Sequence, residues 1–439
     1  KQGQLLQGGT VSVARNSANK GLGKLSVFID SKATDAYNVT QYGIPVGNTS
    51  STAPGSNNMV NLINGNVLYR PVTVGTTPQA VTFSSSQHNG AATASSLFIS
   101  SRFMAWYGGT GAYSDWKYPY RGATNIAAGY GVNFKGTSGS DSEQAGEGVA
   151  NKVSNNTVQR IDFRGLPNDG DITIPVTSGQ WYLLGNPYPS AFNLNQFIID
   201  NAAVIQAVYF YEEYNSGTHT VNQYEAGYGV YTPASGVSAA SVGYYTRPAE
   251  YFMTNGSGEV IVGGGGTAPG AGAQIPFGPF LPLGKGFWIE TKANGTLKFS
   301  NTQRAYIKNS ENNFYPSMSS VVSRTTNNVA NDNWPEIPNV AGIDYTQFSR
   351  KPKPSFAITA KSTTGASNVA FIFDDAALND YNGIEDTKAD LSNDFVMYIP
   401  KTANSIMVSG QPFNVDEKIP VSFKSNTNRY QEGNGLYVS

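Results

Sequence analysis

The sequence predicts a mostly β, multi-domain protein of antiparallel, β-sandwich-like or jelly-roll-like sheets with very few short helices. The 439 residues include 48 Gly, 26 Tyr and 22 Phe, a composition typical of aromatic strands joined by tight turns. Runs of about four to eight residues alternate between apolar and polar side chains and end at Gly, Pro, Asn or Ser, as half-buried strands do. This length suffices for two or three domains with sizeable cores.

Residues 1–90 are predicted to form an N-terminal β region. Thr10–Ala14 and Lys24–Ile29 alternate as strands do, and Ala80–Phe83 gives a further short strand. The polar stretch Asn48–Asn58 is expected to be a loop. No motif in this region points to a ligand, so a small β-sandwich is the simplest expectation.

Residues 91–316 are predicted to hold a duplicated aromatic β module. An aromatic strand opens each copy, at Leu97–Trp106 in the first and at Trp181–Leu184 in the second. A strand flanked by glycine follows in each copy, at Gly129–Phe134 and at Gly286–Ile289. Repeated aromatic hairpins of this kind bury one another in a sandwich or barrel.

Residues 317–354 are rich in Ser, Asn and Pro and are predicted to be a linker. Residues 355–439 follow as a C-terminal β-sandwich, which we expect to lack some of its strands. Five runs in this part have the alternation of strands. They are Phe356–Ala360, Val369–Phe373, Phe395–Ile399, Ser405–Ser409 and Ile419–Phe423.

The stretch Trp181–Ser190 is predicted to be a buried strand that stops at a rigid corner. Glycine permits backbone angles closed to other residues, each proline fixes φ, and a residue before proline is held extended. Ser190 is expected to cap a helical turn over Ala191–Ile199. A ligand-binding loop is the functional alternative to a structural corner. The residues of the corner are Gly185, Asn186, Pro187, Tyr188 and Pro189.

The corner is one of several short motifs that follow one another in a fixed order. They are Gly129–Val132, the turn Asn168–Asp171, Gly185–Ser190, Gly284–Ile289 and Phe299–Arg304. Their order and spacing, over roughly residues 95–305, resemble a module of large secreted surface proteins of the Bacteroidota, the cargo of type IX secretion. No single motif is specific for this family, but the combination is.

The resemblance implies export and a place at the cell surface rather than one particular activity. The C-terminal strands and the acidic turn around Asp380-Tyr381 also resemble the sandwich that follows the module in the same family. We therefore expect a secreted, extracellular or cell-surface protein with a structural or adhesive role that self-associates. The alternatives are a carbohydrate-binding accessory protein that recognises an extracellular glycan, and a non-catalytic part of a larger secreted enzyme.

Composition argues against several other classes. The 29 basic and 30 acidic residues give a net charge of −1, without the basic stripe of a nucleic-acid-binding protein. Cysteine is absent, and His88 and His219 are too few for a histidine-rich metal site. No apolar run approaches the ~20 residues that span a membrane. Lys1–Gln4 lack the apolar segment of a signal peptide, so a processed or partial chain is expected.

Four aromatic residues in a loop-rich part of the first copy are candidate ligand contacts: Trp106, Trp116, Tyr118 and Tyr120. Aromatic faces stack on sugar rings and anchor protein interfaces. Most aromatic side chains of an all-β protein instead fill its core, and the sequence leaves both interpretations open.

An acidic loop in the C-terminal part is a candidate calcium site, and calcium is the single cofactor considered. Asp374, Asp375, Asp380 and Asp386 offer the hard oxygen ligands that calcium prefers. Their spacing differs from that of an EF-hand, so a solvated acidic loop is the alternative.

No catalytic residue is predicted, and we expect the chain not to be an enzyme. The adjacent carboxylates Glu212 and Glu213 lie among tyrosines, as in many glycosidases. Neighbouring residues of a strand point to opposite faces, so these two carboxylates cannot flank one glycosidic bond.

A sandwich that lacks strands would expose an open edge and an uncovered core, which favours pairing with another chain. The segment Leu5–Ala14, with its alternating Thr10–Val13, is the predicted donor strand. Its insertion into a neighbouring subunit would be a head-to-tail contact and would build an open filament. The alternative is a chain that continues beyond Ser439 and completes its own sandwich.

Overall fold

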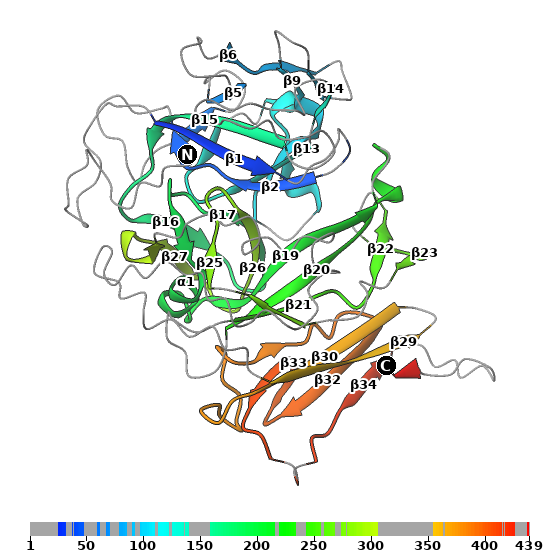
Figure 1. Cartoon of the computed structure of the whole chain (residues 1–439). Helices are drawn as coiled ribbons and strands as arrows, with labels where there is room; N and C mark the ends of the chain where they lie inside the picture. Colours follow the sequence, from blue (N-terminus) through cyan, green and yellow to red (C-terminus); the bar gives the residue numbers. More distant parts are fainter. Residues whose placement is uncertain are drawn as a thin grey trace, which may run out of the picture.

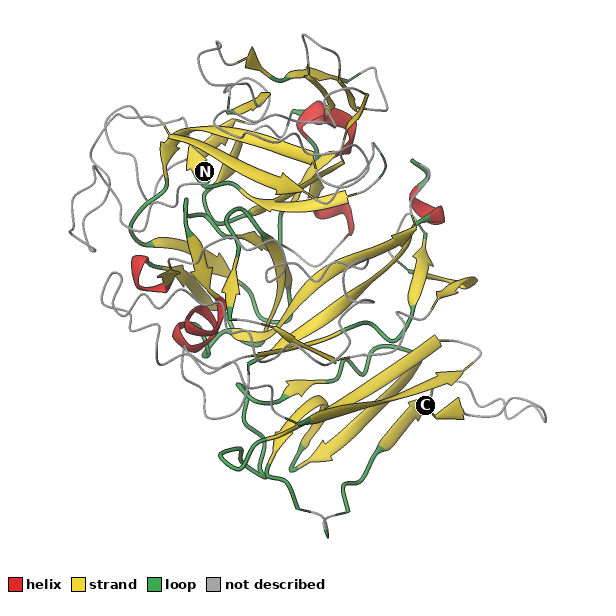
Figure 2. Ribbon diagram, viewed as in Figure 1, coloured by secondary structure: helices red, strands yellow, loops and turns green. Residues whose placement is uncertain are grey.

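The computed structural model confirms the mostly β prediction, with one α-helix, α1 (Leu194–Asp200), in the described part of the chain (Figures 1 and 2). The strands form an N-terminal part, a central sheet and a C-terminal sheet, coloured from blue through green to red in Figure 1. None of the described helices is long and apolar enough to cross a membrane. The structure describes most of residues 25–305 and 354–425, with 437–438; the longer stretches outside this description are 1–24, 48–58, 71–78, 140–158, 234–242, 306–353 and 426–436.

The N-terminal part consists of short strands from both sides of residue 90, with three turns of 3₁₀-helix. Its elements are β1 (Leu25–Ser31), β2 (Val39–Gly43), β3 (Val46–Gly47), β4 (Met59–Asn61), β5 (Leu68–Arg70), β6 (Gln79–Ala80), β7 (Thr82–Ser84), β8 (Gly90–Ala92), β9 (Leu97–Ser100), η1 (Ser101–Phe103), β10 (Met104–Tyr107), η2 (Tyr113–Asp115), β11 (Trp116–Lys117), η3 (Pro119–Arg121), β12 (Asn125–Ala127), β13 (Gly131–Lys135), β14 (Thr137–Gly139) and β15 (Gln159–Pro167).

These strands pair across the predicted domain boundary at residue 90. Strand β1 is antiparallel to β15 along its whole length, β2 pairs with β13, and β4 pairs with β12. The buried rings of Tyr42 on β2 and Phe134 on β13 stack at 4.3 Å within the shared core. Residues on both sides of position 90 therefore fold together into one structural unit. The structure shows no domain boundary at residue 90, where the sequence predicted one.

The central part contains an eight-stranded sheet that curls around its core. Its order is β17-β26-β19-β20-β21-β24, with β22 joined to β20 and β23 joined to β22. The elements are β16 (Ile172–Val176), β17 (Trp181–Gly185), β18 (Ala191–Asn193), β19 (Ile205–Asn215), η5 (Val221–Gln223), β20 (Glu225–Thr232), β21 (Gly243–Thr246), β22 (Tyr251–Thr254), β23 (Val260–Thr267), β24 (Gln274–Phe277), β25 (Phe280–Leu281), β26 (Gly286–Thr291), β27 (Gly295–Phe299), η6 (Asn301–Gln303) and β28 (Arg304–Ala305).

The inner face of this sheet packs on helix α1. The helix buries Phe197, whose ring lies 4.7 Å from Phe299 of β27. It starts after Asn193, whose side-chain oxygen accepts a hydrogen bond from the Gln196 N–H at 3.0 Å, as an N-cap does. The cap predicted at Ser190 is therefore wrong, because strand β18 occupies the three residues after Ser190 and delays the helix.

The N-terminal and central sheets touch through their backbones where β2 crosses β17. A Cβ on Gly185 would lie 2.2 Å from the Cα of Gly43. On the neighbouring strand, a Cβ on Gly131 would lie 2.5 Å from the carbonyl oxygen of Leu184. Such an approach requires residues without side chains, so these glycines allow the backbones of the two sheets to pack directly against each other.

One strand pair recurs in the two halves of the predicted duplication. Strand β10 is antiparallel to β13 in the first half, and β17 is antiparallel to β26 in the second. Beyond this pair the neighbours differ, since β13 continues to β2 whereas β26 continues to β19. The shared motifs therefore correspond to one strand pair set in two different sheets.

The C-terminal part is a seven-stranded sheet of order β34-β32-β33-β30-β29-β35, with β31 beside β33. Four of the five predicted strands match, whereas the fifth starts at Ser422 instead of Ile419. Residues 317–353 of the predicted linker lie outside the described residues. The strands are β29 (Ser355–Ser362), β30 (Gly365–Phe373), β31 (Thr387–Lys388), β32 (Phe395–Lys401), β33 (Asn404–Gln411), β34 (Ser422–Ser425) and β35 (Tyr437–Val438).

The C-terminal sheet docks on the outer face of the central sheet. Ala370, Ile372 and Val408 belong to the same buried cluster as Tyr209 and Trp288 of the central sheet. Hydrogen bonds also cross the junction. For example, the hydroxyl oxygens of Thr232 and Thr387 lie 3.0 Å apart, and the Asn368 amide donates to the Arg247 carbonyl at 3.0 Å. The opposite face of the C-terminal sheet holds a second buried cluster, which includes Val369, Phe371 and Met397, and partly buried phenylalanines pack against this cluster.

Candidate functional site

The proline corner lies in the interior, where Gly185, Asn186, Pro187, Tyr188 and Pro189 are all buried. The Asn186 amide donates to the carbonyl oxygens of Ser190 at 2.8 Å and Pro282 at 3.2 Å, and its oxygen accepts from the Tyr188 N–H at 3.1 Å. One asparagine thus satisfies two backbone groups of a bend that has no regular ladder, and one carbonyl of the segment beside it. This burial supports the structural interpretation of the corner over a ligand-binding loop.

Arg304, a buried residue of the last of the sequence motifs, contacts the proline corner and stabilises it. Arg304 donates to the Asp169 carboxylate at 3.1 Å and to the Ser190 hydroxyl at 3.2 Å. Its guanidinium also lies 5.0 Å above the Tyr188 ring. Burial lowers the pKa of Arg304 to about 10, and the charge of Asp169 opposes that shift. The motif residues noted in the sequence therefore meet as one structural hub.

The four aromatic residues predicted as ligand contacts do not form one surface. Trp106 packs against the N-terminal core, and Trp116 lies edge-on to Trp288 of the central sheet at 5.8 Å. Tyr118 and Tyr120 form a separate edge-on pair at 5.7 Å. All four are partly exposed. The structure thus assigns the two tryptophans mainly to packing.

A larger aromatic surface lies on the outer side of the central sheet. We call it the aromatic face. Its rings come from β17, β19, β20 and β26, where the alternation of each strand turns every second side chain outward. The sequence predicts that Trp181 is part of a strand, but it does not indicate a surface position for this side chain. The strand register, which no local pattern contains, brings the rings together. The residues are Trp181, Tyr209, Tyr211, Tyr228 and Trp288.

The rings of the aromatic face form two layers. Tyr209 and Trp288 are 6% and 4% exposed and make the lower layer. Trp181 stacks on Tyr209 with ring centroids 4.4 Å apart, and Tyr228 lies edge-on to Trp288 at 5.9 Å. Tyr228 is 41% exposed. Of the upper rings, Tyr228 is exposed and Trp181 is partly exposed, and buried rings below hold both in place.

Charged groups border the aromatic face where the C-terminal part approaches it. The Tyr209 hydroxyl donates to the Glu290 carboxylate at 2.9 Å. Burial and the negative charge of Asp390 raise the pKa of Glu290. Burial and the positive charge of Lys388 lower the pKa of Lys292. The border thus combines carboxylates and ammonium groups.

Glu212 and Glu213 point to opposite sides of β19, as their adjacency predicted. Glu212 accepts hydrogen bonds from Arg247 at 2.9 Å and from the Tyr251 hydroxyl inside the sheet. Glu213 accepts from the Val39 N–H at 2.9 Å. Each carboxylate thus has its own partners, and the two do not face a common space.

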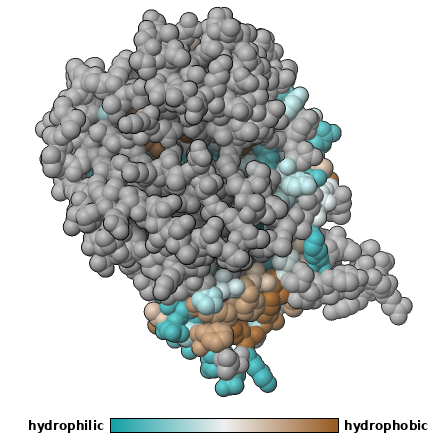
Figure 3. All heavy atoms as spheres, in the orientation of Figure 1, coloured by the Kyte–Doolittle hydropathy of each residue, from teal (hydrophilic) through white to brown (hydrophobic). Residues whose placement is uncertain are grey.

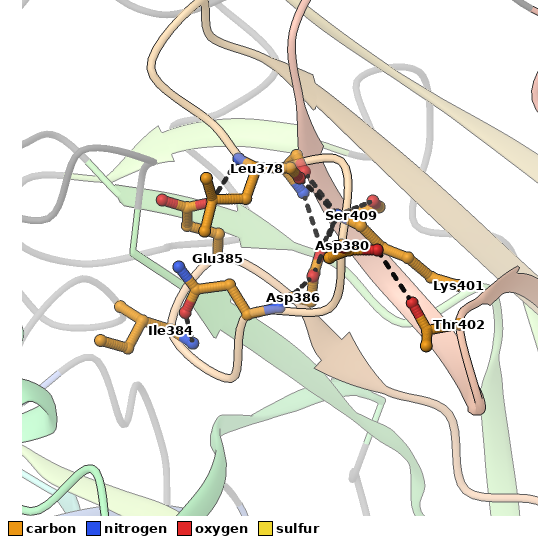
Figure 4. Close-up of polar contacts among 10 residues, drawn as sticks. Leu378, Asp380, Ile384, Glu385, Asp386, Lys401, Thr402 and Ser409 are labelled. Carbon is orange, nitrogen blue, oxygen red and sulfur yellow. Dashed lines mark hydrogen bonds and ion pairs between the residues drawn. The ribbon is translucent and has the colours of Figure 1, made fainter.

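The acidic loop holds an internal cation instead of presenting its carboxylates to one point. Lys401 donates to the Asp386 carboxylate at 3.1 Å and to the carbonyl oxygens of Leu378 and Gly410 at 2.9 and 3.0 Å. Figure 4 shows its side chain reaching the loop from the neighbouring strand. Burial raises the pKa of Asp386, whereas the bonds from Asn382 and Lys401 lower it. The ammonium group thus occupies an oxygen-lined position.

The other predicted calcium ligands are dispersed. Asp374 is buried and Asp375 is exposed. Asp380 is exposed and accepts a hydrogen bond from the Thr402 hydroxyl at 3.1 Å (Figure 4). Across the described ranges, no group of three or more His, Cys, Asp or Glu side chains is placed to hold a metal ion. This geometry gives the calcium prediction no support, and calcium binding remains a prediction.

The margin of this second cluster on the C-terminal sheet carries exposed phenylalanines, and we call this surface the phenylalanine face. Each exposed ring lies on a ring nearer the core: Phe356 stacks on Phe371 at 4.8 Å, and Phe413 lies edge-on to Phe373 at 5.3 Å. Figure 3 shows apolar surface gathered over this part of the molecule. The members are Phe356, Phe373, Phe395, Phe413 and Phe423.

Comparison with known proteins identifies one family. The model of a domain of unknown function, DUF8693, matches residues 44–431, which is most of the chain. No curated protein and no solved structure matches the sequence. The match runs through the N-terminal, central and C-terminal parts, in agreement with the contacts that join them. The chain therefore belongs to the DUF8693 family.

Proposed function

We propose that this protein is a secreted, cell-surface structural or adhesive subunit, and that it self-associates by adding a strand from a second copy to its C-terminal sheet. The observation that carries the proposal is the phenylalanine face, where Phe356, Phe413 and Phe423 are 45%, 60% and 43% exposed. Exposed apolar groups gathered in one place mark an interaction site. The proposed role is assembly and attachment rather than catalysis.

An open strand edge borders the phenylalanine face. Strand β29 pairs with β30 along its whole length, whereas on its other side β35 reaches Ala360 and Lys361 alone. Within the described residues, the outer edge of 355–359 has no strand partner. An added strand could use these backbone groups and cover Phe356 with its own side chains.

The donor that best fits this edge is Leu5–Ala14 of a second copy. The segment lies outside the described residues, so its fit is argued from sequence. Val11 and Val13 would share one face of a strand, and Thr10 and Ser12 the other. No residue of the segment is charged, so its insertion buries no charge. Such a contact is head-to-tail and repeats, which gives an open filament.

Light scattering of matched variants tests the proposed surface. The double variant Phe356→Ser/Phe413→Ser should shift the wild-type assemblies to single subunits, because it removes two of the apolar contacts that the donor would cover. Tyr214→Ser is the control, since Tyr214 is 51% exposed but lies on the central sheet. Its assemblies should keep the wild-type size. Wild-type protein that stays monomeric at high concentration, or equal loss in the control, would contradict the proposal.

A further inference from the structure

We infer that the aromatic face binds an uncharged saccharide, stacked on Trp181 and Tyr228. This site is separate from the phenylalanine face, because it lies on the central sheet and does not depend on self-association. It also differs from the aromatic residues that the sequence suggested. Three features support it: accessible rings on a fixed base, a border of mixed charge, and an unused buried donor.

The rings are oriented before any ligand arrives. Trp181 rests on Tyr209 at 4.4 Å with an angle of 25° between the rings, and Tyr228 lies edge-on to Trp181 at 5.9 Å. Tyr211 supports Tyr228 from the side at 5.6 Å. Because neighbouring rings restrict these side chains already, binding would cost little additional side-chain entropy. The C–H-rich face of a sugar ring carries the weak positive charge that suits an aromatic face.

The border supplies both kinds of hydrogen-bonding group. Glu290 lies directly opposite Trp181 in the pairing of β17 with β26. In addition to burial, the negative charge of Asp390 raises the pKa of Glu290. In the same way, the positive charge of Lys388 adds to the effect of burial and lowers the pKa of Lys292. A sugar hydroxyl both donates and accepts, so it can use carboxylates and ammonium groups alike. Two charges of each sign favour an uncharged ligand over an anion such as a phosphate chain.

An unused donor lies beneath the rings. The Trp288 indole N–H is buried and has no hydrogen-bond partner in the described part of the chain. The same side chain is 4% exposed and contacts both Trp181 and Tyr228. A buried donor left unpaired is costly, and a ligand or a water molecule can supply the missing partner. This observation is independent of the exposed rings.

Isothermal titration with neutral oligosaccharides tests the site on the full chain. Probes are hexasaccharides of cellulose, β-1,3-glucan, mannan and chitin, at concentrations up to about 1 mM to detect weak binding. We expect one or more to bind the wild-type protein. Trp181→Ala and Tyr228→Ala should each weaken binding about tenfold or more, because each removes an anchoring ring. Trp181→Phe should retain most of the affinity.

Tyr214→Ala is the matched control, because Tyr214 is an exposed tyrosine on the same sheet that stacks on Tyr251 instead. It should bind as the wild type does, and thermal melting would verify that each variant is folded. Absence of binding to all four probes would overturn the inference. Equal affinity of the wild type and a folded Trp181→Ala variant would overturn it as well. Neither result depends on whether the chain assembles.

Discussion

Lys401 brings its ammonium group to the place where the sequence suggested a calcium ion. Its side chain is 8% exposed and pairs with Asp386, whose side chain is fully buried. Removing one partner of a buried ion pair leaves the other charge without compensation. A lysine at the end of strand β32, which follows the loop, thus determines the electrostatics of the loop. Counting carboxylates alone therefore pointed to a metal.

Lys401→Met should lower the free energy of unfolding by ~3–5 kcal/mol, because it leaves the buried Asp386 charge unpaired. Adding Asp386→Asn should recover much of that loss, since the variant then buries no unpaired charge. Urea unfolding of the two single variants and the double variant measures this coupling. Simple additivity of the two single effects would show that the pair is not coupled.

Glu290 gives the protein a predictable pH dependence. Because burial raises its pKa above the ordinary value of 4.5, the native state holds this proton more tightly than the unfolded chain does. The stabilisation is therefore fully present below the unfolded pKa and is lost as pH rises through the folded pKa. Glu290→Gln should flatten the fall in the urea midpoint as the pH rises above the ordinary glutamate pKa of 4.5. An unchanged slope would contradict the role of Glu290.

At the scale of elements, the proline corner stabilises the fold through chain stiffness as well as through Asn186. Pro187→Ala with Pro189→Ala should cost roughly 1–2 kcal/mol, because it increases the freedom of the unfolded chain. The melting temperature should fall by a few degrees, and saccharide binding should persist in the folded fraction. Differential scanning calorimetry measures the shift. Unchanged stability with lost binding would instead make the corner part of a ligand site.

Individual strands could be predicted where alternation is strong and turn residues are close. The strand at Trp181–Leu184 and the first four C-terminal runs are examples, because glycine or proline punctuates them. The helix cap could not be predicted, since Ser190 and Asn193 are both good caps and tertiary pairing of β18 decided between them. Strand partners far apart in the chain, such as β1 and β15, leave no local signal.

At the scale of the whole molecule, the fold class was evident from composition, whereas the sites were not. The aromatic face depends on the register of four strands, so Trp181 and Tyr228 meet although one belongs to β17 and the other to β20. Trp116, which the sequence suggested as a ligand contact, belongs to the N-terminal part and packs against the buried cluster that contains Tyr209 and Trp288. The exposed phenylalanines lie in the part where missing strands were expected, and that expectation stays a prediction.

The central claim is that subunits exchange a strand, and deleting residues 1–14 tests it most directly. Electron microscopy and sedimentation of the full chain should show filaments, and the deleted chain should remain as single subunits. A synthetic peptide of residues 5–14 should then bind the deleted chain but not the Phe356→Ser/Phe413→Ser variant of that chain. Filaments of unchanged length after the deletion, or a full chain that sediments as a single subunit, would contradict the account.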